Sequence, residues 1–329
     1  MSVETLTIQG ISRPVSRIAL GTWAIGGWMW GGSDESKAIA TIRSAVERGI
    51  NLIDTAPVYG FGNSEEIMGK ALEGIRDKAV IATKVALDWN DDGPFRNATP
   101  ARIRQEIEDS LRRLKTDHID LYQVHWPDPL TPIDETAREL EKLRQEGKVL
   151  ALGVSNFSPE QMDAFRDVAP LAAVQPPYNL FERDIEKDVL PYAKDHGLAV
   201  LAYGALCRGL LAGKMSPSTR FDGDDLRKVD PKFQSPRFEQ YLAAVAALED
   251  YARARHDKTV LALAIRWILD KGPTIALWGA RKPEQIEGVD EAFGWSLSQE
   301  ELDEIDKILT RHVTDPVGPE FMAPPTRKG

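Results

Sequence analysis

The sequence has little of several features that mark particular classes of protein. It has one cysteine, Cys207, among 329 residues, so no disulfide can form within the chain. No apolar run approaches the roughly 20 residues that a helix needs to span a bilayer. The first residues also lack the basic segment and apolar core of a secretory signal peptide. We therefore expect a cytoplasmic protein without a membrane partner.

Positive charge and metal-ligand patterns are scarce as well. The chain has 41 Lys and Arg against 51 Asp and Glu, which gives a net charge of -10. Binding to a nucleic-acid backbone relies on cationic groups that release counterions, so we expect no nucleic-acid partner. The five histidines are scattered, and no HExxH spacing occurs. We therefore predict no metal site.

Eight short apolar runs alternate with amphipathic segments along the chain. They are rich in Ile, Val and Leu with little polar alternation, which is typical of parallel strands covered on both faces. The alternation predicts an α/β protein, a (β/α)8 TIM barrel, as a single domain over residues 1–329 with long βα loops at its C-terminal face. A doubly wound open sheet is the alternative, but its GxGxxG motif is absent. The expected strands are 17–22, 50–55, 79–84, 119–125, 149–155, 171–175, 199–204 and 274–279.

The segments between the strands carry helix signals. Thr99 and Ser158 are expected as N-caps, each followed by a proline at the first helical position, and Asn63 is a further cap candidate. Two segments lack such signals. Residues 213–238 are polar and Pro-rich and read as a long loop or lid, and residues 311–329 read as an irregular C-terminal tail.

Four polar side chains follow three neighbouring predicted strands. Asp54 ends the second strand with Tyr59 just beyond it, Lys84 ends the third, and His125 ends the fourth. In such a barrel the active site lies where strands end and βα loops begin. Each residue alone also fits a structural role, as a cap, a rim aromatic, a solvated lysine or a hydrogen-bonded histidine. Because those separate roles do not predict convergence at one rim, we interpret the four residues as catalytic.

The joint chemistry of these four groups is that of a general acid. A free phenol has a pKa near 10, and we expect the ammonium group of Lys84 to lower the pKa of Tyr59. Asp54 would hold that ammonium charged and in place, and His125 would orient or polarise a substrate oxygen. The arrangement predicts proton donation to a carbonyl, with neither a metal nor a covalent nucleophile.

The most specific motif extends beyond these four residues. NLIDTAPVYGFGNSEE matches N-x-x-D-T-A-x-x-Y-G-x-x-x-S-E, and Lys84 and His125 stand in IATK and YQVHWP. On these motifs the chain resembles the aldo-keto reductases, NAD(P)H-dependent oxidoreductases on a (β/α)8 barrel, from LGTWAIGG through GARKPEQ. The resemblance implies that Asp54, Tyr59, Lys84 and His125 are the catalytic tetrad. It also implies that Tyr59 protonates the carbonyl oxygen as hydride passes from nicotinamide C4 to the carbonyl carbon.

The resemblance also implies a nicotinamide cofactor site. Ser155, Asn156 and Gln175 would hydrogen-bond the carboxamide, and Tyr203 would stack on the nicotinamide ring. The segment YGALCRGLLAGK would form the pyrophosphate loop, and residues 205–238 would cover the cofactor. The other implied cofactor positions are Gly21, Thr22, Trp23, Asp54, Gly204, Ala205, Leu206, Cys207, Arg208, Gly209, Leu210, Lys214, Gly279 and Ala280.

NADPH is the expected cofactor. Arg281 and Lys282 follow the eighth strand, and two cations beside a helix N-terminus suit the adenosine 2′-phosphate. Such a pair in a loop can equally be solvated without a ligand. Where the family often has Arg, Glu and Asn in the following helix, this chain has Gln285, Gly288 and Val289. This departure leaves NADH open as a second cofactor.

Large aromatic residues gather in the loops after the predicted strands. Exposed apolar patches mark binding surfaces, although these residues would also suit a cap on the barrel core. We interpret them as the wall of a pocket for an uncharged aldehyde or ketone. GTWAIGGWMWGG and FMAPP resemble a bacterial branch acting on short polyol aldehydes such as glyceraldehyde. The expected substrate residues are Trp23, Trp30, Tyr59, Trp89, His125 and Trp126, with Trp28 and Phe61 nearby.

Two other functions share the fold or the residues. One is a cofactor-binding redox sensor with little turnover, similar to the cytoplasmic subunit of voltage-gated potassium channels. The other is a lyase in which Lys84 forms a Schiff base, which would require an uncharged lysine despite the neighbouring Asp54. The motifs leave the oligomeric state and the physiological substrate open.

Overall fold

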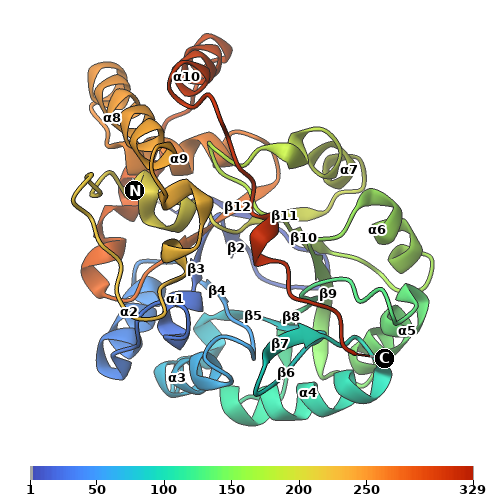
Figure 1. Ribbon diagram of the computed structural model, residues 1–329. Helices are drawn as coiled ribbons and strands as arrows, with labels where there is room; N and C mark the ends of the chain where they lie inside the picture. Colours follow the sequence, from blue (N-terminus) through green and yellow to red (C-terminus); the bar gives the residue numbers. More distant parts are fainter. Residues whose placement is uncertain (1–2, 329) are drawn as a thin grey trace.

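Eight parallel strands close into a barrel in the computed structural model, which describes residues 3–328 (Figure 1). Each of the eight predicted strands is present, so the predicted single-domain (β/α)8 barrel is confirmed. The barrel strands are β3 (Ile18–Gly21), β4 (Leu52–Asp54), β5 (Val80–Val85), β8 (Ile119–Val124), β9 (Val149–Ser155), β10 (Ala173–Gln175), β11 (Ala199–Ala202) and β12 (Thr274–Gly279).

Helices surround the barrel, and several begin at the caps that the sequence indicates. Thr99 accepts a hydrogen bond from the backbone N–H of Arg102, and Ser158 forms a capping box with Gln161. At Asn63 the expectation is wrong by one residue, because the cap is Gly62, with a left-handed φ of 101°. The helices are α1 (Trp23–Gly26), α2 (Glu35–Glu47), α3 (Asn63–Ala71), α4 (Pro100–Leu114), α5 (Ile133–Gln145), α6 (Pro159–Arg166), α7 (Val189–Asp195), α8 (Arg237–His256), α9 (Val260–Leu269) and α10 (Gln299–His312).

Short 3-10 turns complete the helical structure. The long loop at 213–238 contains two of them and has no strand among its residues. No helix within residues 3–328 is long and apolar enough to cross a membrane. The 3-10 turns are η1 (Arg76–Lys78), η2 (Asp184–Glu186), η3 (Cys207–Ala212), η4 (Leu226–Lys228), η5 (Pro231–Phe233), η6 (Pro283–Ala292) and η7 (Glu320–Met322).

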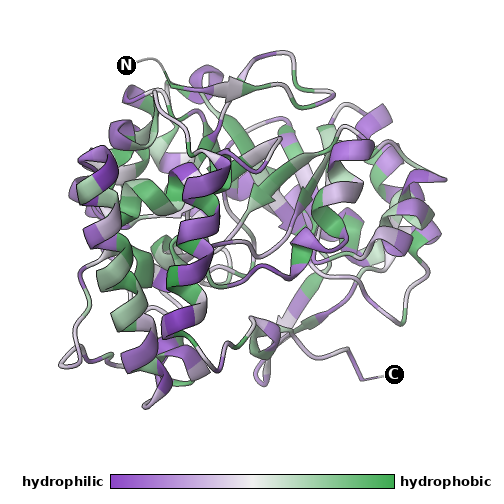
Figure 2. Cartoon of the chain, turned by 90° about the horizontal axis from the view of Figure 1, so that it is seen from above, coloured by the Kyte–Doolittle hydropathy of each residue, from purple (hydrophilic) through white to green (hydrophobic). Residues whose placement is uncertain are grey.

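The core has two apolar layers, one inside the barrel and one between the strands and the helices (Figure 2). Successive side chains of a strand point to opposite faces, so Leu52 lies in the inner layer and Ile53 in the outer one. An N-terminal hairpin of β1 (Thr5–Leu6) and β2 (Val15–Ser16) adds Ile8 and Val15 to the inner layer. The apolar filling leaves the carboxyl ends of the strands as the place for polar groups.

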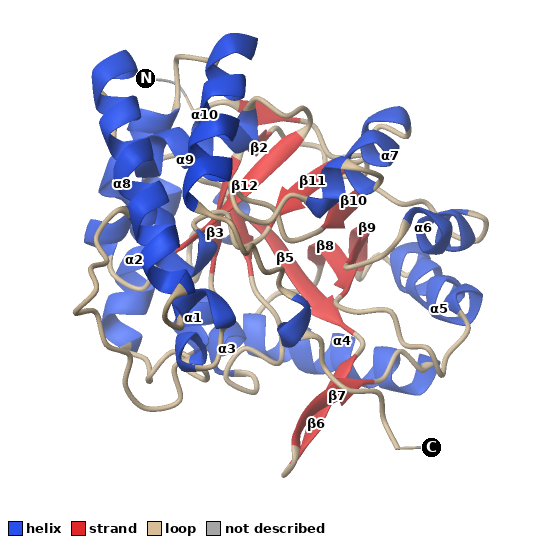
Figure 3. Cartoon of the chain, turned by 45° about the horizontal axis from the view of Figure 1, so that its top comes forward, coloured by secondary structure: helices blue, strands red, loops and turns tan. Residues whose placement is uncertain are grey.

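Two segments at the carboxyl end of the barrel differ from the sequence expectation. After β5 the chain forms an antiparallel hairpin of β6 (Leu87–Asn90) and β7 (Gly93–Arg96), which projects from the barrel in Figure 3. The helix α10 ends at His312, so the irregular tail begins two residues later than expected. Residues 313–328 cross the barrel face toward β7, where Thr326 forms a bridge with Arg96 (red in Figure 1).

Candidate active site

The inward-facing ends of neighbouring strands form a polar layer above the apolar core. Register places Asp54 of β4 beside Ala82, and Lys84 of β5 beside Gln123 of β8. Asp54 is 2% exposed and Lys84 is 0% exposed. The Nζ atom of Lys84 lies 2.7 Å from Oδ2 of Asp54 and donates to the carbonyl oxygen of Thr55 at 2.9 Å. The pair is thus a buried ion pair with a second acceptor for the ammonium group.

Two side-chain amides complete the shell around Asp54. Gln175 of β10 donates from Nε2 to Oδ1 of Asp54 at 2.8 Å, and Gln123 donates to the same oxygen at 3.3 Å. Gln123 is a site residue that the sequence analysis missed. Its signal was its position in β8, an even number of residues before His125 in YQVH, which gives it an inward-facing side chain.

Tyr59 stands directly above the ion pair. Its ring centroid lies 5.1 Å from Nζ of Lys84, 5.8 Å from the His125 ring and 6.0 Å from the Trp23 ring. The loop that carries Tyr59 packs backbone to backbone on the end of α1, since a Cβ atom on Gly26 would lie 2.5 Å from the carbonyl group of Tyr59. Glycine at that position therefore allows Tyr59 to approach Trp23. The structure brings all four predicted tetrad residues together.

A buried cluster of hydroxyl groups supports this rim from behind. Ser64 Oγ, at the start of α3, lies 2.8 Å from Thr22 Oγ1 and 2.9 Å from Thr55 Oγ1. Thr22 Oγ1 in turn donates to the carbonyl oxygen of Asp54 at 2.9 Å. The cluster joins the loops that carry Trp23, the ion pair and Tyr59.

Burial controls the charge states of the rim. It raises the pKa of Tyr59 well above the usual value, and the negative charge of Asp54 adds to that effect. Burial and the positive charge of Lys84 lower the pKa of His125 well below its usual value. The expectation of a lowered pKa for Tyr59 is therefore wrong, because burial and the charge of Asp54 both raise it. The phenol and the imidazole are both neutral at neutral pH.

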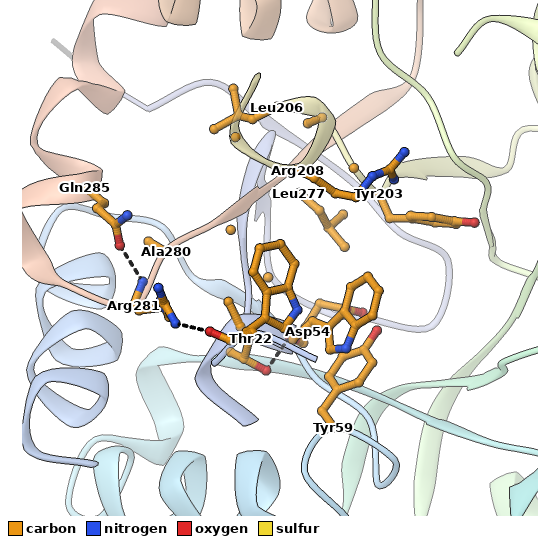
Figure 4. Close-up of a pocket in the computed structure, with 18 of the residues that line it drawn as sticks. Thr22, Asp54, Tyr59, Tyr203, Leu206, Arg208, Leu277, Ala280, Arg281 and Gln285 are labelled. Atoms are coloured by element: carbon orange, nitrogen blue, oxygen red, sulfur yellow. Dashed lines mark hydrogen bonds between the residues drawn. The ribbon is translucent and has the colours of Figure 1, made fainter. Parts of the chain in front are cut away.

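A first cavity of about 200 Å³ opens beside the ion pair. Asp54 and Tyr59 lie on one side of it and Arg281 and Gln285 on the other (Figure 4). Most of the predicted cofactor residues line it. They are Gly21, Thr22, Trp23, Asp54, Tyr203, Gly204, Ala205, Leu206, Arg208, Gly209, Gly279, Ala280, Arg281 and Gln285.

The charged groups of the first cavity are already hydrogen-bonded within the protein. Arg281 donates to the carbonyl oxygen of Trp30 at 2.7 Å, and the Gln285 side-chain oxygen accepts from the backbone N–H of Arg281 at 2.8 Å. Arg227 stacks 5.2 Å from the Trp30 ring. Arg227 was not predicted from the sequence, because only the fold of the 213–238 loop brings it to the cavity.

A second cavity, of about 250 Å³, adjoins the first, since Trp23, Tyr59 and Tyr203 line both. Its lining includes the imidazole of His125 and otherwise has no ionisable side chain except the phenols of Tyr59 and Tyr203 among the described residues. Of the predicted substrate residues, Trp23, Tyr59, His125 and Trp126 line it. The other lining residues are Trp28, Met29, Val58, Leu87, Pro94, Ser155, Asn156, Gln175, Val229, Phe321, Met322 and Pro324.

Several predicted residues lie outside the cavity they were assigned to. Trp30 lines the first cavity rather than the second. Its ring meets the ring of Trp23 edge-on, with the two ring centres 5.5 Å apart. Trp89 lies outside both, because its ring packs on Phe61 and under the guanidinium group of Arg102.

Four predicted cofactor residues also lie outside both cavities. The 3-10 turn η3 directs Cys207 and Leu210 into the core, where each is 0% exposed. Lys214 and Lys282 are exposed to solvent. The predicted contacts of Lys214 and Lys282 with the cofactor would therefore require their side chains to move toward the first cavity.

Comparison with known proteins gives one consistent family. The model described as "Aldo/keto reductase family" matches residues 17–310. The chain is 60% identical over 329 residues to the aldo-keto reductase YhdN of Bacillus subtilis (strain 168), covering 99% of each protein. The structure of the glycerol dehydrogenase AKR11B4 from Gluconobacter oxydans is similar with a TM-score of 0.89 at 62% identity, covering 98% of this chain and 100% of that one.

A more distant structure shows the same fold with a ligand. The aldo/keto reductase from Klebsiella pneumoniae, in complex with NADP and acetate, has a TM-score of 0.74 at 29% identity, covering 100% of this chain and 98% of that one. The family match covers all eight barrel strands, including β4 and β5, which carry Asp54 and Lys84, and β8, which His125 follows. The chain therefore belongs to the aldo-keto reductase family, whose members are NAD(P)H-dependent oxidoreductases.

Proposed function

We propose that this protein reduces aldehydes and ketones to alcohols with NADPH, reversibly, and that Tyr59 is the general acid. The observation that carries the proposal is the position of Tyr59, which stands over the Asp54–Lys84 ion pair where the two cavities meet. A carbonyl group held at that junction would have the phenol and the imidazole on its oxygen side.

We assign the first cavity to part of the dinucleotide. Gly279 lines it, and a Cβ atom there would have no other atom within 4 Å, so the absence of a side chain keeps that wall open. Ser155, Asn156 and Gln175 present hydroxyl and amide groups at the junction with the second cavity, beside Tyr203. We assign these groups to the nicotinamide end and Arg281 to the adenosine phosphate. When bound, the nicotinamide supplies hydride.

Residues 205–238 would cover the cofactor. The carboxylate of Asp224 accepts from the backbone N–H groups of Met29 at 2.8 Å and Gly31 at 3.0 Å. Together with the contact of Arg227 on Trp30, these bonds join the loop to the segment after β3 along one wall of the first cavity. Release of the cofactor would then require those contacts to open.

The side chains of the tetrad divide the remaining work. His125, neutral because its pKa is depressed, orients the carbonyl oxygen by donating a hydrogen bond. Tyr59 keeps its proton until that oxygen gains negative charge, and then gives it up. The Asp54–Lys84 ion pair supports the ring of Tyr59 from below. The apolar wall of the second cavity excludes water.

The apolar second cavity supports an uncharged substrate. Short aldehydes of the glyceraldehyde type are our first candidates, since the similar Gluconobacter oxydans structure is that of a glycerol dehydrogenase. The test is turnover of a panel of short polyol, aliphatic and aromatic aldehydes by the purified protein with NADPH. Turnover supports a reductase, whereas tight NADPH binding without turnover of any aldehyde would favour a cofactor-sensing module. Borohydride trapping of an aldehyde on Lys84 would indicate a lyase, although its ammonium group is buried against Asp54.

The assignment of the adenosine phosphate gives the first prediction. The double variant Arg281→Ala/Lys282→Ala should lose NADPH affinity by roughly tenfold or more, because charge-assisted contacts to the 2′-phosphate disappear. NADH affinity should change far less. Quenching of tryptophan fluorescence measures both, and equal weakening of the two cofactors would remove the 2′-phosphate role.

A further inference from the structure

A cluster of four buried charged side chains contacts the C-terminal tail, and one of them, Arg208, also lines the first cavity. It consists of Glu182, Arg208, Asp230 and Lys232, which we call the charge hub, and each member is at most 6% exposed. Arg208 donates from Nη2 to Glu182 at 2.7 Å and from Nε to Asp230, and Lys232 Nζ lies 2.8 Å from Glu182. Two carboxylates and two cations balance, so the hub can be fully ionised in the interior.

The hub joins segments that lie far apart in the sequence. Glu182 follows β10, Arg208 lies in η3 after β11, and Asp230 and Lys232 belong to the long loop. Burial opposes the charge on Glu182, yet Arg208 and Lys232 lower the pKa of its carboxyl group. Arg208 also has a left-handed φ of 54°, a conformation that a non-glycine residue adopts at a cost. Arg208 was expected from the sequence to meet the cofactor phosphates, but its guanidinium group already donates to two carboxylates.

Both cations of the hub also contact the C-terminal tail. Lys232 donates from Nζ to the carbonyl oxygen of Gly318 at 3.1 Å. Arg208 places Nη1 3.8 Å from the sulfur of Met322 and its guanidinium carbon 5.6 Å from the centre of the Phe321 ring. These two tail residues line the second cavity, and Met322 lines the first as well. The hub therefore stands directly behind the part of the tail that a substrate would touch.

We propose that the charge hub positions the C-terminal wall of the substrate cavity and so sets how far the site discriminates between long and short aldehydes. Lys232 and Arg208 act through Phe321 and Met322 and are positioning residues. A short aldehyde held at Tyr59 and His125 would not reach that wall, whereas a bulky one would pack on it. Loosening the hub should therefore weaken binding of the bulky substrate selectively. The role in selectivity rests on the proposed reductase function, whereas the effect of the hub on the tail can be measured without any turnover.

The test uses a charge-balanced variant, because removing Lys232 alone would leave an uncompensated buried carboxylate. Glu182→Gln/Lys232→Met removes one charge of each sign and leaves the Arg208–Asp230 pair. Lys232→Arg is the conservative variant that should restore the contact. Lys228→Met is the matched control, since Lys228 belongs to the same loop and bonds the carbonyl oxygen of Gly223 rather than the tail.

Two readouts separate the parts of the proposal. Hydrogen exchange should show amides of residues 313–328 exchanging about tenfold faster in the double variant than in the wild type and the Lys228→Met control. With NADPH saturating, the KM for an aromatic aldehyde should rise roughly tenfold, while the KM for a short aliphatic aldehyde and kcat stay within about twofold. Lys232→Arg should keep both the exchange rates of the tail and the KM for the aromatic aldehyde close to the wild-type values.

Each outcome decides one part of the inference. Unchanged exchange in the tail of a folded double variant would overturn the positioning role. A loosened tail with an unchanged ratio of the two KM values would overturn the role in selectivity. If the wild type turns over no aldehyde, the proposed function fails, and the exchange measurement still decides whether the hub holds the tail.

Discussion

Burial opposes charge on the residues at the barrel rim, and this determines which protonation states the site offers. Tyr59 keeps its proton because burial and Asp54 raise its pKa, and His125 stays neutral because burial and Lys84 lower its pKa. The sequence motif located both residues correctly. It could not give the direction of the shift in the pKa of Tyr59, because that depends on how deeply the folded chain buries the ring and on how near Asp54 lies to it.

These directions predict the pH dependence of the reaction. The acid form of Tyr59 is present up to at least about pH 10 and the neutral form of His125 from about pH 6.5 upward, so kcat/KM for reduction should be flat between these limits. Alcohol oxidation needs the phenolate as base and should speed up as the pH rises. Steady-state rates in both directions measure this. A reductive rate that falls with an apparent pKa between about 7 and 8 would show that the pKa of Tyr59 is lowered after all.

The Asp54–Lys84 pair predicts a stability effect. Lys84→Met should destabilise the protein by about 3–5 kcal/mol, because it leaves a buried carboxylate without its cation. The double variant Asp54→Asn/Lys84→Met should lose clearly less free energy of unfolding, because it leaves no unpaired buried charge. Urea unfolding followed by fluorescence measures the difference, with Lys187→Met in the exposed pair to Asp184 as a control that should change little. A loss in the double variant equal to the sum of the losses in Lys84→Met and Asp54→Asn alone would mean that the pair is not coupled.

At the scale of elements, the start of α3 explains why the motif ends in Ser-Glu. Ser64 ties together Thr22 and Thr55 through its hydroxyl group, and Glu65 accepts from Thr83 at 2.6 Å and from Arg113 at 2.7 Å. Both residues are 0% exposed. The start of the helix therefore anchors the loop of Tyr59 to the ends of β3, β4 and β5 by polar contacts, in addition to the apolar packing of Ile67 and Met68 in the core.

This anchoring predicts a cost for the loss of one hydroxyl. Ser64→Ala should lower the free energy of unfolding by about 1–3 kcal/mol, because two threonine hydroxyls lose a buried partner. The matched control is Ser110→Ala in α4, since Ser110 is also 0% exposed but its hydroxyl has no partner among residues 3–328. The control should be neutral or slightly stabilising. Equal effects of the two substitutions would show that the cluster adds nothing to stability.

The barrel elements could be predicted because their signals are local. Apolar runs gave all eight strands, and Thr99 and Ser158 gave two helix starts. The β6–β7 hairpin was missed, because its residues 87–96 are mostly polar or turn-forming and resemble a loop. Its stability depends on partners outside the hairpin, such as the tail residue Pro325, whose carbonyl oxygen accepts from the backbone N–H of Arg96 at 2.9 Å.

At the scale of the whole molecule, segments distant in sequence close both ends of the barrel. The N-terminal hairpin fills the amino end, and the tail crosses the carboxyl end, where the guanidinium group of Arg327 pairs with Asp128. The sequence gives no local sign of these contacts, which is why the tail residues Phe321, Met322 and Pro324 were not predicted to line the second cavity. The convergence of Asp54, Tyr59, Lys84 and His125 and most of the lining of the first cavity were predictable, because these residues lie at strand ends that the barrel brings together.

The role of Tyr59 is tested most directly by single-turnover reduction of an aldehyde by the NADPH-loaded protein, comparing the wild type with Tyr59→Phe. Tyr192→Phe is the control, a tyrosine on α7 whose hydroxyl bonds Asp163. We predict that Tyr59→Phe slows hydride transfer by about 10²–10⁴-fold while its NADPH affinity and the control rate stay unchanged. Hydride transfer at the wild-type rate in a folded, NADPH-saturated Tyr59→Phe variant would contradict the assignment of Tyr59 as the acid.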